Sequence, residues 1–309
     1  MKITVEDIIK DLELEILVEG EENTEIKTSD INRPGLQFAG FYSYFANSRV
    51  QVIGNAEWSF LKNMPIELTK KRMKKFFQFD TPCIIIARDL EPHPLLIKNA
   101  KLNRRWVLRS KFLTTKVITK LMNYLDVKLA PETRMHGVLV DVYGIGILIT
   151  GESGIGKSET ALELIKRGHR LVADDAVDIK EIDGVLRGTS PYITSGMLEV
   201  RGMGIIDIPS LYGLSSVLQR KTIHLVIYLE QWKSDRNYDR LGIDDEFLEI
   251  LNVPVKKLTV PIRPGRNLAV IIEAAAANYR YNLMSEVSPV ETINNRMEQV
   301  MNGERQGWN

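Results

Sequence analysis

The chain has 309 residues, 44% of them hydrophobic and 26% charged, which is typical of a soluble globular protein with one or two domains. Because its 41 basic residues nearly balance 40 acidic ones, no global charge favours nucleic acid or an anionic membrane as a partner. The sequence shows no signal-peptide pattern, no apolar run of membrane length and no cysteine besides Cys83, which argues against secreted and membrane-spanning classes and favours the cytoplasm.

Residues 1–129 alternate between strand and helix patterns, which predicts a small α/β domain. The strand patterns cover Leu14–Val18, Arg49–Ile53, Cys83–Ala87 and Trp106–Arg109. The helical patterns cover Val5–Asp11, Lys70–Phe77 and Thr114–Tyr124. The apolar surroundings of Cys83 favour a buried thiol over a nucleophile. The polar segment Ser29–Gly35, with Arg33, is interpreted as a solvated loop, so this domain shows no catalytic constellation.

The pattern breaks near Lys128–Thr133, so we place a second domain at residues 130–309. Its first predicted strand is His136–Tyr143, followed by a turn at 144–146 and a partner strand at 147–150. His136 has two interpretations at this stage. It is either a structural residue at the start of a strand or a functional group beside the segment that follows.

That segment reads Gly151-Glu152-Ser153-Gly154-Ile155-Gly156-Lys157-Ser158 and matches G-x-x-x-x-G-K-[ST], the loop that wraps nucleotide phosphates. We call residues 151–158 the phosphate loop. A β-branched strand pattern precedes the loop, and a helical pattern, Ser158–Arg167, follows it. The loop is therefore expected at a helix N-terminus, where backbone N–H groups and the helix dipole attract anions. Lys157 would add a charge toward the outer phosphates, and the Ser158 hydroxyl would ligate Mg²⁺.

A short buried-strand pattern then ends in Asp174 and Asp175, where phosphate-loop enzymes hold magnesium. Adjacent side chains on a strand point to opposite faces, so the two carboxylates need not share one task. One could face the metal and the other the attacking nucleophile. A solvated turn with an Asp cap is the competing interpretation.

Downstream, Leu198–Ile208 mixes apolar residues with glycines and charges. Glu199 is a candidate magnesium ligand there, although a bulged edge strand explains the same pattern. Val226–Leu229 predicts a strand, and Arg240 follows in a polar stretch. Arg263 and Arg266 precede the helical run Leu268–Tyr281 and form either a second anion site or an exposed basic loop. Residues 290–300 predict a terminal amphipathic helix.

The assembled motifs resemble those of bacterial HPr kinase/phosphorylase. The matching segments are Arg33-Pro34-Gly35, the run from His136 through the phosphate loop to Asp175, Leu198–Asp207 and Pro261–Arg266. The resemblance implies a small N-terminal α/β domain and a C-terminal P-loop kinase domain similar to the nucleotide core of phosphoenolpyruvate carboxykinase. It also implies ATP-dependent phosphorylation of a serine on HPr, and phosphorolysis of the phosphoserine with release of pyrophosphate.

Further expectations come from the same resemblance. The enzyme would assemble as a homohexamer, act in carbon catabolite repression, and respond to fructose 1,6-bisphosphate and phosphate. Asp175 would exchange the serine proton, with His136 influencing its protonation, and Ser158 and Glu199 would hold Mg²⁺ with Asp174 as a further ligand. The remaining catalytic residues would be Lys157 and Arg240 on the moving phosphoryl group, and Arg263 and Arg266 in the reverse direction.

Three rival interpretations share the nucleotide site. A small-molecule or carboxykinase-like enzyme would not need the first domain or a terminal helix suited to binding a protein partner such as HPr. A GTP-hydrolysing switch would carry an Asn-Lys-x-Asp motif, which the sequence lacks. A non-catalytic nucleotide sensor would not need Lys157, Ser158, Asp174, Asp175 and Arg240 together.

Overall fold

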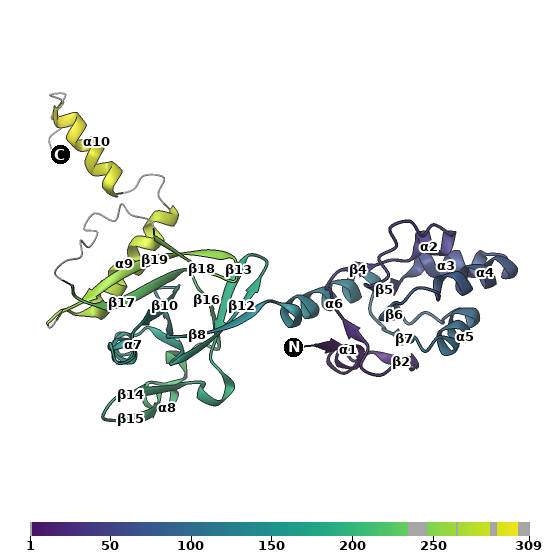
Figure 1. Cartoon of the computed structure of the whole chain (residues 1–309), viewed down its shortest axis with the longest axis horizontal. Coiled ribbons are helices and arrows are strands. Elements are labelled where there is room, and N and C mark those ends of the chain that lie inside the picture. The colour runs from purple at the N-terminus through teal and green to yellow at the C-terminus, as the bar shows by residue number, and fades with distance from the viewer. Residues whose placement is uncertain (1, 234–245, 264, 285–288, 302–309) are drawn as a thin grey trace. The chain divides into compact units, whose positions relative to one another are not determined.

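The computed structural model describes residues 2–233, 246–263, 265–284 and 289–301. The chain forms two compact units, Met1–Ala130 and Pro131–Asn309, and each is described by itself (Figure 1). Within the described residues, no helix is both long and apolar enough to span a membrane.

The N-terminal unit is built on a mixed sheet with the strand order β2-β7-β6-β5-β4. The strands are β2 (Glu15–Val18), β4 (Ile31–Asn32), β5 (Val50–Ile53), β6 (Cys83–Ile86) and β7 (Trp106–Arg109). Strands β4 to β7 are parallel, and β2 pairs with β7 in the antiparallel sense. A small ribbon pairs β1 (Ile3–Thr4) with β3 (Glu25–Ile26). The four longer strands are those that the β-branched runs predict.

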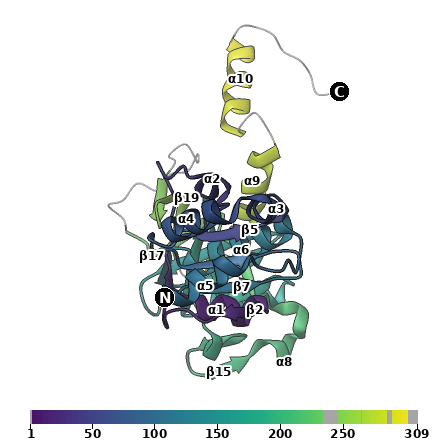
Figure 2. The same cartoon turned by 90° about the vertical axis from the view of Figure 1, so that its right-hand side faces the viewer.

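Helices cover both faces of this sheet. Successive strand residues point to opposite faces, and both sets are apolar and buried, so each face needs a covering layer. One face packs against α1 (Val5–Leu12) and α6 (Thr114–Leu129). The other packs against α2 (Gly35–Ala39), α3 (Asn55–Asn63), α4 (Ile66–Phe76) and α5 (Pro94–Leu102). Helices α2, α3 and α4 lie next to one another (Figure 2). Cys83 is fully buried, and burial raises the pKa of its thiol, which confirms the structural interpretation.

The interpretation of Ser29–Gly35 as a solvated loop is wrong, because the segment contains β4, which pairs with β5, and ends at the start of α2. The Arg33 guanidinium Nη2 lies 2.8 Å from Oε2 of Glu57, which is buried. The same carboxylate oxygen accepts a hydrogen bond from the Gly54 N–H at 2.9 Å, at the start of α3. Arg33 therefore connects the segment after β4 to the helix after β5.

Phe76 is expected to be a main support of the N-terminal unit. Its ring is fully buried and lies 5.3 Å from the ring of Phe38 and 5.4 Å from that of Phe77. Phe76→Ala should lower the free energy of unfolding by about 3–5 kcal/mol, because it leaves a cavity. Phe60→Ala, at a half-exposed position, should cost about 0.5 kcal/mol or less. Urea denaturation of the full chain measures the free energy of unfolding of each variant. Equal losses in the two variants would contradict the role of Phe76 as a main support of the N-terminal unit.

The C-terminal unit has a core sheet with the strand order β11-β9-β10-β17-β19-β18. Its strands are β9 (Val138–Val142), β10 (Ile145–Gly151), β11 (Arg170–Ala173), β17 (Leu225–Gln231), β18 (Glu246–Ile250) and β19 (Val253–Ile262). Strands β10, β17 and β19 are parallel. Helices α7 (Lys157–Lys166) and α9 (Leu268–Met284) pack on one face through apolar side chains. The predicted helix after the phosphate loop is thereby confirmed to within one residue at each end.

An outer sheet packs against the opposite face of the core sheet through a second apolar cluster. Its strand order is β16-β13-β12-β8. The strands are β8 (Glu132–His136), β12 (Ala176–Ile182), β13 (Val185–Thr189) and β16 (Arg220–Thr222). The remaining elements are the hairpin β14 (Met197–Val200) and β15 (Gly204–Asp207), helices α8 (Ile208–Tyr212) and α10 (Pro289–Met301), and 3₁₀ turns at Tyr192–Thr194 and Leu214–Ser216.

The predicted strand His136–Tyr143 and its partner at 147–150 are confirmed as the antiparallel pair β9 and β10. The start of the strand differs, because His136 ends β8 of the outer sheet and Gly137 separates β8 from β9. Gly137 passes so close to β10 that a Cβ atom there would lie 2.7 Å from the Ile149 carbonyl oxygen. This crossing lets one short segment contribute to both sheets, and it places His136 at the end of β8.

Candidate active site

The phosphate loop connects β10 to the first turn of α7, as the strand–loop–helix pattern predicts. Gly154 and Gly156 have φ values of 79° and 100°, in the left-handed region that side chains with a Cβ rarely adopt. Gly156 immediately precedes α7, and its carbonyl oxygen accepts hydrogen bonds from both the N–H and the hydroxyl of Thr160. The loop thus presents the N-terminus of a long helix to an anion.

Lys157 is a buried cation within this loop, with only 7% of its surface exposed. Its Nζ donates hydrogen bonds to the carbonyl oxygens of Gly151 at 3.0 Å and Glu152 at 2.9 Å. These bonds fix the ammonium group within the loop, where Lys157 also lines a cavity. A positive charge is therefore held beside the space that a phosphate could enter.

Asp174 follows β11 and joins the loop to a distant hairpin. Its carboxylate accepts hydrogen bonds from the Ser158 hydroxyl at 2.8 Å and from the Glu199 backbone N–H at 2.9 Å. Burial raises the pKa of this carboxyl, and the two hydrogen bonds partly oppose that shift by favouring the charged form. Asp174 thereby holds Glu199 on strand β14 close to the Ser158 hydroxyl.

Asp175 turns away from its neighbour, because its backbone lies in the left-handed region with φ 64°. Its Oδ1 lies 3.1 Å from Nδ1 of His136, and both side chains are more than half exposed. The Asp175 carbonyl also accepts a hydrogen bond from the Gly137 N–H. The two adjacent aspartates thus have separate surroundings, one buried against Ser158 and one open to a substrate.

These groups line one cavity of about 100 Å³, which is polar and of a size suited to phosphate groups. The lining residues are His136, Val138, Ser153, Gly154, Gly156, Lys157, Ser158, Glu159, Asp174, Asp175, Glu199 and Arg201. The structure therefore brings His136, both aspartates and Glu199 to the phosphate loop. Gly151, Glu152 and Ile155 belong to the loop without lining the cavity.

Arg201 is a site residue that the sequence analysis missed. It lies in the turn between β14 and β15, and its guanidinium packs directly on Gly154, with Nη2 3.5 Å from the Ser153 hydroxyl oxygen. In the sequence it is one charge in a mixed segment, and only the hairpin brings it to the loop. Val138 and Glu159 are the other lining residues without an assigned role.

The predicted arginines of the C-terminal part lie elsewhere. The Arg263 guanidinium carbon stacks 3.1 Å from the ring centroid of Trp232, and Arg266 Nη1 donates to the Pro261 carbonyl at 3.0 Å. Neither side chain lines the cavity. Arg240 lies outside the described residues.

The donor set also fits magnesium. Hydroxyl and carboxylate oxygens of Ser158, Asp174 and Glu199 share the cavity, and oxygen is the ligand atom that Mg²⁺ prefers. No group of three or more His, Cys, Asp or Glu side chains among the described residues forms a protein-only metal cage. Magnesium commonly uses one or two carboxylates together with substrate phosphates and water, so such a cage is not required.

Comparison with known proteins gives matches along most of the chain. Residues 3–125 match the family described as HPr Serine kinase N terminus, and residues 127–297 match HPr Serine kinase C-terminal domain. The HPr kinase/phosphorylase of Clostridium novyi is 91% identical over 304 residues, covering 98% of this chain and 99% of that protein. That of Clostridium acetobutylicum is 71% identical over 302 residues, with coverages of 98% and 99%.

A solved structure of the Hpr(Ser) kinase/phosphatase from Coxiella burnetii is 38% identical and covers 49% of this chain and 93% of that one, with a TM-score of 0.47. Both family matches and the near-complete coverage of the clostridial proteins agree with the resemblance drawn from the motifs. The chain belongs to the HPr kinase/phosphorylase family.

Proposed function

We propose that this protein phosphorylates a serine of HPr with ATP, and that with inorganic phosphate it removes the phosphoryl group again as pyrophosphate. The observation that carries the proposal is the placement of Asp175 and His136 in the same cavity as the phosphate loop. The 91% identity to a protein named HPr kinase/phosphorylase supports both directions of the reaction.

In the forward direction, Asp175 accepts the proton of the serine hydroxyl. Its carboxylate is exposed and meets the cavity, so a protein substrate reaches it without unfolding the loop. His136, with Nδ1 3.1 Å from the Asp175 carboxylate, orients that carboxylate. Lys157 and the loop N–H groups stabilise charge on the transferring phosphoryl group. The family resemblance gives the same role to Arg240, which is not among the described residues.

Magnesium would be held by Ser158 and Glu199, with Asp174 as a further ligand. When bound, the ion neutralises charge on the phosphate oxygens. Asp174 already bonds the Ser158 hydroxyl and the Glu199 N–H, so it fixes the other two residues in position. This orienting contact supports Asp174 as the residue that assembles the metal site.

The reverse direction uses the same groups. A loop that grips the outer phosphates of ATP can also grip pyrophosphate, because both present the same kind of oxygens. Asp175 then deprotonates the attacking phosphate and returns the proton to the serine oxygen. Arg263 and Arg266 would bind that phosphate, although in the described arrangement they contact Trp232 and Pro261.

The family resemblance alone supports several wider proposals. These are a homohexamer, cytoplasmic location, a role in carbon catabolite repression, and regulation by fructose 1,6-bisphosphate and phosphate. The same basis supports a P-loop catalytic domain at residues 130–309 that is similar to the phosphoenolpyruvate carboxykinase nucleotide core. The role of the N-terminal domain, residues 1–129, is left open by the resemblance.

Arg266→Ala should reduce phosphorolysis at least several-fold more than phosphorylation, because only phosphorolysis needs a site for free phosphate. A lost charge-assisted contact costs about 1.5–3 kcal/mol. Initial rates in both directions, measured on one enzyme preparation, give the ratio directly. Equal losses would show that residues 261–266 do not serve the reverse reaction specifically.

The function as a whole is tested by incubating the protein with HPr, ATP and magnesium, and then adding phosphate. Mass spectrometry should detect a phosphoserine on HPr that disappears once phosphate is supplied. A sample in which HPr stays unmodified in the presence of ATP and magnesium would contradict the proposal.

A further inference from the structure

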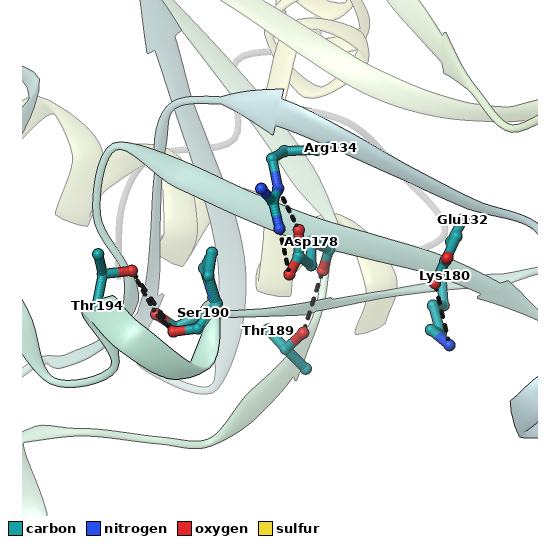
Figure 3. A network of polar contacts seen from close by, with 8 residues as sticks. Glu132, Arg134, Asp178, Lys180, Thr189, Ser190 and Thr194 are labelled. Atoms are coloured by element: carbon teal, nitrogen blue, oxygen red, sulfur yellow. Dashed lines mark hydrogen bonds and ion pairs between the residues drawn. The ribbon is translucent and has the colours of Figure 1, made fainter. Parts of the chain in front are cut away.

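The outward face of the outer sheet carries charged side chains in cross-strand rows. On β8 and β12 these charges are paired (Figure 3). Arg134 makes two hydrogen bonds to the Asp178 carboxylate, at 2.6 and 3.1 Å, and Lys180 lies 3.2 Å from Glu132. This half of the face is therefore electrically balanced by its own residues.

The other half of the face differs. Arg187 on β13 is directly opposite Thr222 on β16, and Arg220 is opposite Thr189, so the two arginines are diagonal neighbours on one face. Both are exposed, and neither has an acidic side chain within ion-pair distance in the described part of the chain. Two uncompensated like charges at this spacing repel each other, so the arrangement favours an anion between them.

The arginines belong to a cavity of about 420 Å³, within the size range of small-molecule sites. It is lined by Gly144, Arg187, Arg220, Lys221, Thr222 and His224, with three cations and no carboxylate among these residues. Beneath it, Lys221 Nζ lies 3.1 Å from Oδ1 of the buried Asp141, which also pairs with Arg170. Asp141 thus pairs with both Lys221 and Arg170. The charges of Arg187 and Arg220 stay uncompensated, so the lining is positively charged.

His224 contributes a fixed polar group to the same lining. Its Nδ1 accepts a hydrogen bond from the Gly146 N–H at 3.0 Å, which places the proton of the neutral ring on Nε2. Burial and the nearby Lys221 lower the pKa of this imidazole, so it stays neutral near pH 7. The ring is then a positioned donor, while Arg187 and Arg220 supply the uncompensated charge and Lys221 stays paired with Asp141.

We propose that this cavity binds a small anion through a phosphate group, at a site separate from the phosphate loop. Guanidinium groups match phosphate oxygens with paired N–H donors, and the Thr222 hydroxyl adds a further donor. The lining contains no aromatic ring on which a base of single-stranded nucleic acid would stack, apart from the neutral His224.

The separation from the catalytic cavity follows from the sheet order. Strand β16 forms the opposite edge of the outer sheet from β8, which carries His136. Three strand-to-strand steps separate these edges, or about 14 Å. No residue lines both cavities.

Isothermal titration of the full chain tests the proposal, with inorganic phosphate and glycerol 3-phosphate as probes. All variants carry Lys157→Ala, which weakens binding at the phosphate loop. Adding Arg187→Ala and Arg220→Ala should lower the affinity for at least one probe tenfold or more. Adding Arg134→Ala and Lys180→Ala removes the same charge from the paired half of the face and should change the affinity less than twofold. Tighter binding of inorganic phosphate would identify free phosphate as the ligand, and tighter binding of glycerol 3-phosphate would identify a phosphomonoester.

Unchanged affinity in the Arg187/Arg220 variant, or an equal loss in the Arg134/Lys180 control, would overturn the proposal. Binding of a single-stranded oligonucleotide without binding of either small probe would also overturn it. With Lys157 intact, Arg187→Ala and Arg220→Ala should leave the rate of HPr phosphorylation within twofold when no added anion is present. A kinase defect with unchanged probe affinity would place these arginines in the catalytic reaction instead.

Discussion

Replacing Lys157 with alanine is expected to lower the rates of HPr phosphorylation and of phosphorolysis by about 10²–10³-fold each. The side chain is buried in the phosphate loop and holds its charge against the Gly151 and Glu152 carbonyls. Both reactions place negative charge on the same phosphoryl oxygens, so both lose the same stabilisation. Steady-state rates at saturating ATP, or at saturating phosphate, measure the two losses.

Lys166→Ala is the matched control for this variant. Lys166 is exposed at the far end of α7, so its removal takes the same charge from the same helix without touching the loop. It should keep both rates within about twofold. Near-normal turnover in the Lys157 variant, with a folded circular dichroism spectrum, would remove the phosphate loop from the mechanism.

Asp175→Asn should lower kcat in both directions by about 10²–10⁴-fold, the range for loss of a general base. Asparagine preserves the size of the side chain and can keep the contact with His136, but it cannot accept the serine proton. Asp175 is exposed and does not bond Ser158, so KM for ATP should change little. Initial rates over a range of ATP concentrations separate the two parameters.

Asp183→Asn, in the exposed turn between β12 and β13, provides the control and should match the wild type. A rise in KM for ATP with kcat unchanged in the Asp175 variant would assign this carboxylate to nucleotide binding. If the Asp175 variant keeps both kcat and the KM for ATP, Asp175 acts neither as the general base nor in nucleotide binding.

The parts of the site that lie close in sequence could be predicted from the sequence. A β-branched strand, a glycine-rich segment ending in Lys157 and Ser158, and an amphipathic helix form a local unit, and the structure contains β10, the loop and α7 in those positions. Strand alternation predicted separate roles for Asp174 and Asp175. Both residues in fact follow the end of β11, and the left-handed backbone of Asp175 turns the two side chains apart. Their actual partners, Ser158 and His136, depend on the packing of distant strands.

Features set by tertiary contacts were missed. Gly137 separates β8 from β9 and approaches Ile149 closely, and nothing in the local apolar pattern marks that crossing. Arg201 reaches the loop only through the β14–β15 turn. Helix α5 was also missed, although His93 as its cap and Pro94 in its first turn are a readable start signal.

The most direct measurement of the central claim follows one labelled phosphoryl group through the complete cycle. HPr is phosphorylated with ATP labelled in the γ-phosphate, separated from nucleotide, and returned to the enzyme with magnesium and unlabelled phosphate. If one loop serves ATP and pyrophosphate alike, the label should leave the serine as pyrophosphate, and both steps should fail together in the Lys157 and Asp175 variants. Label released as free phosphate, or a reverse step that survives in those variants, would contradict a single shared site.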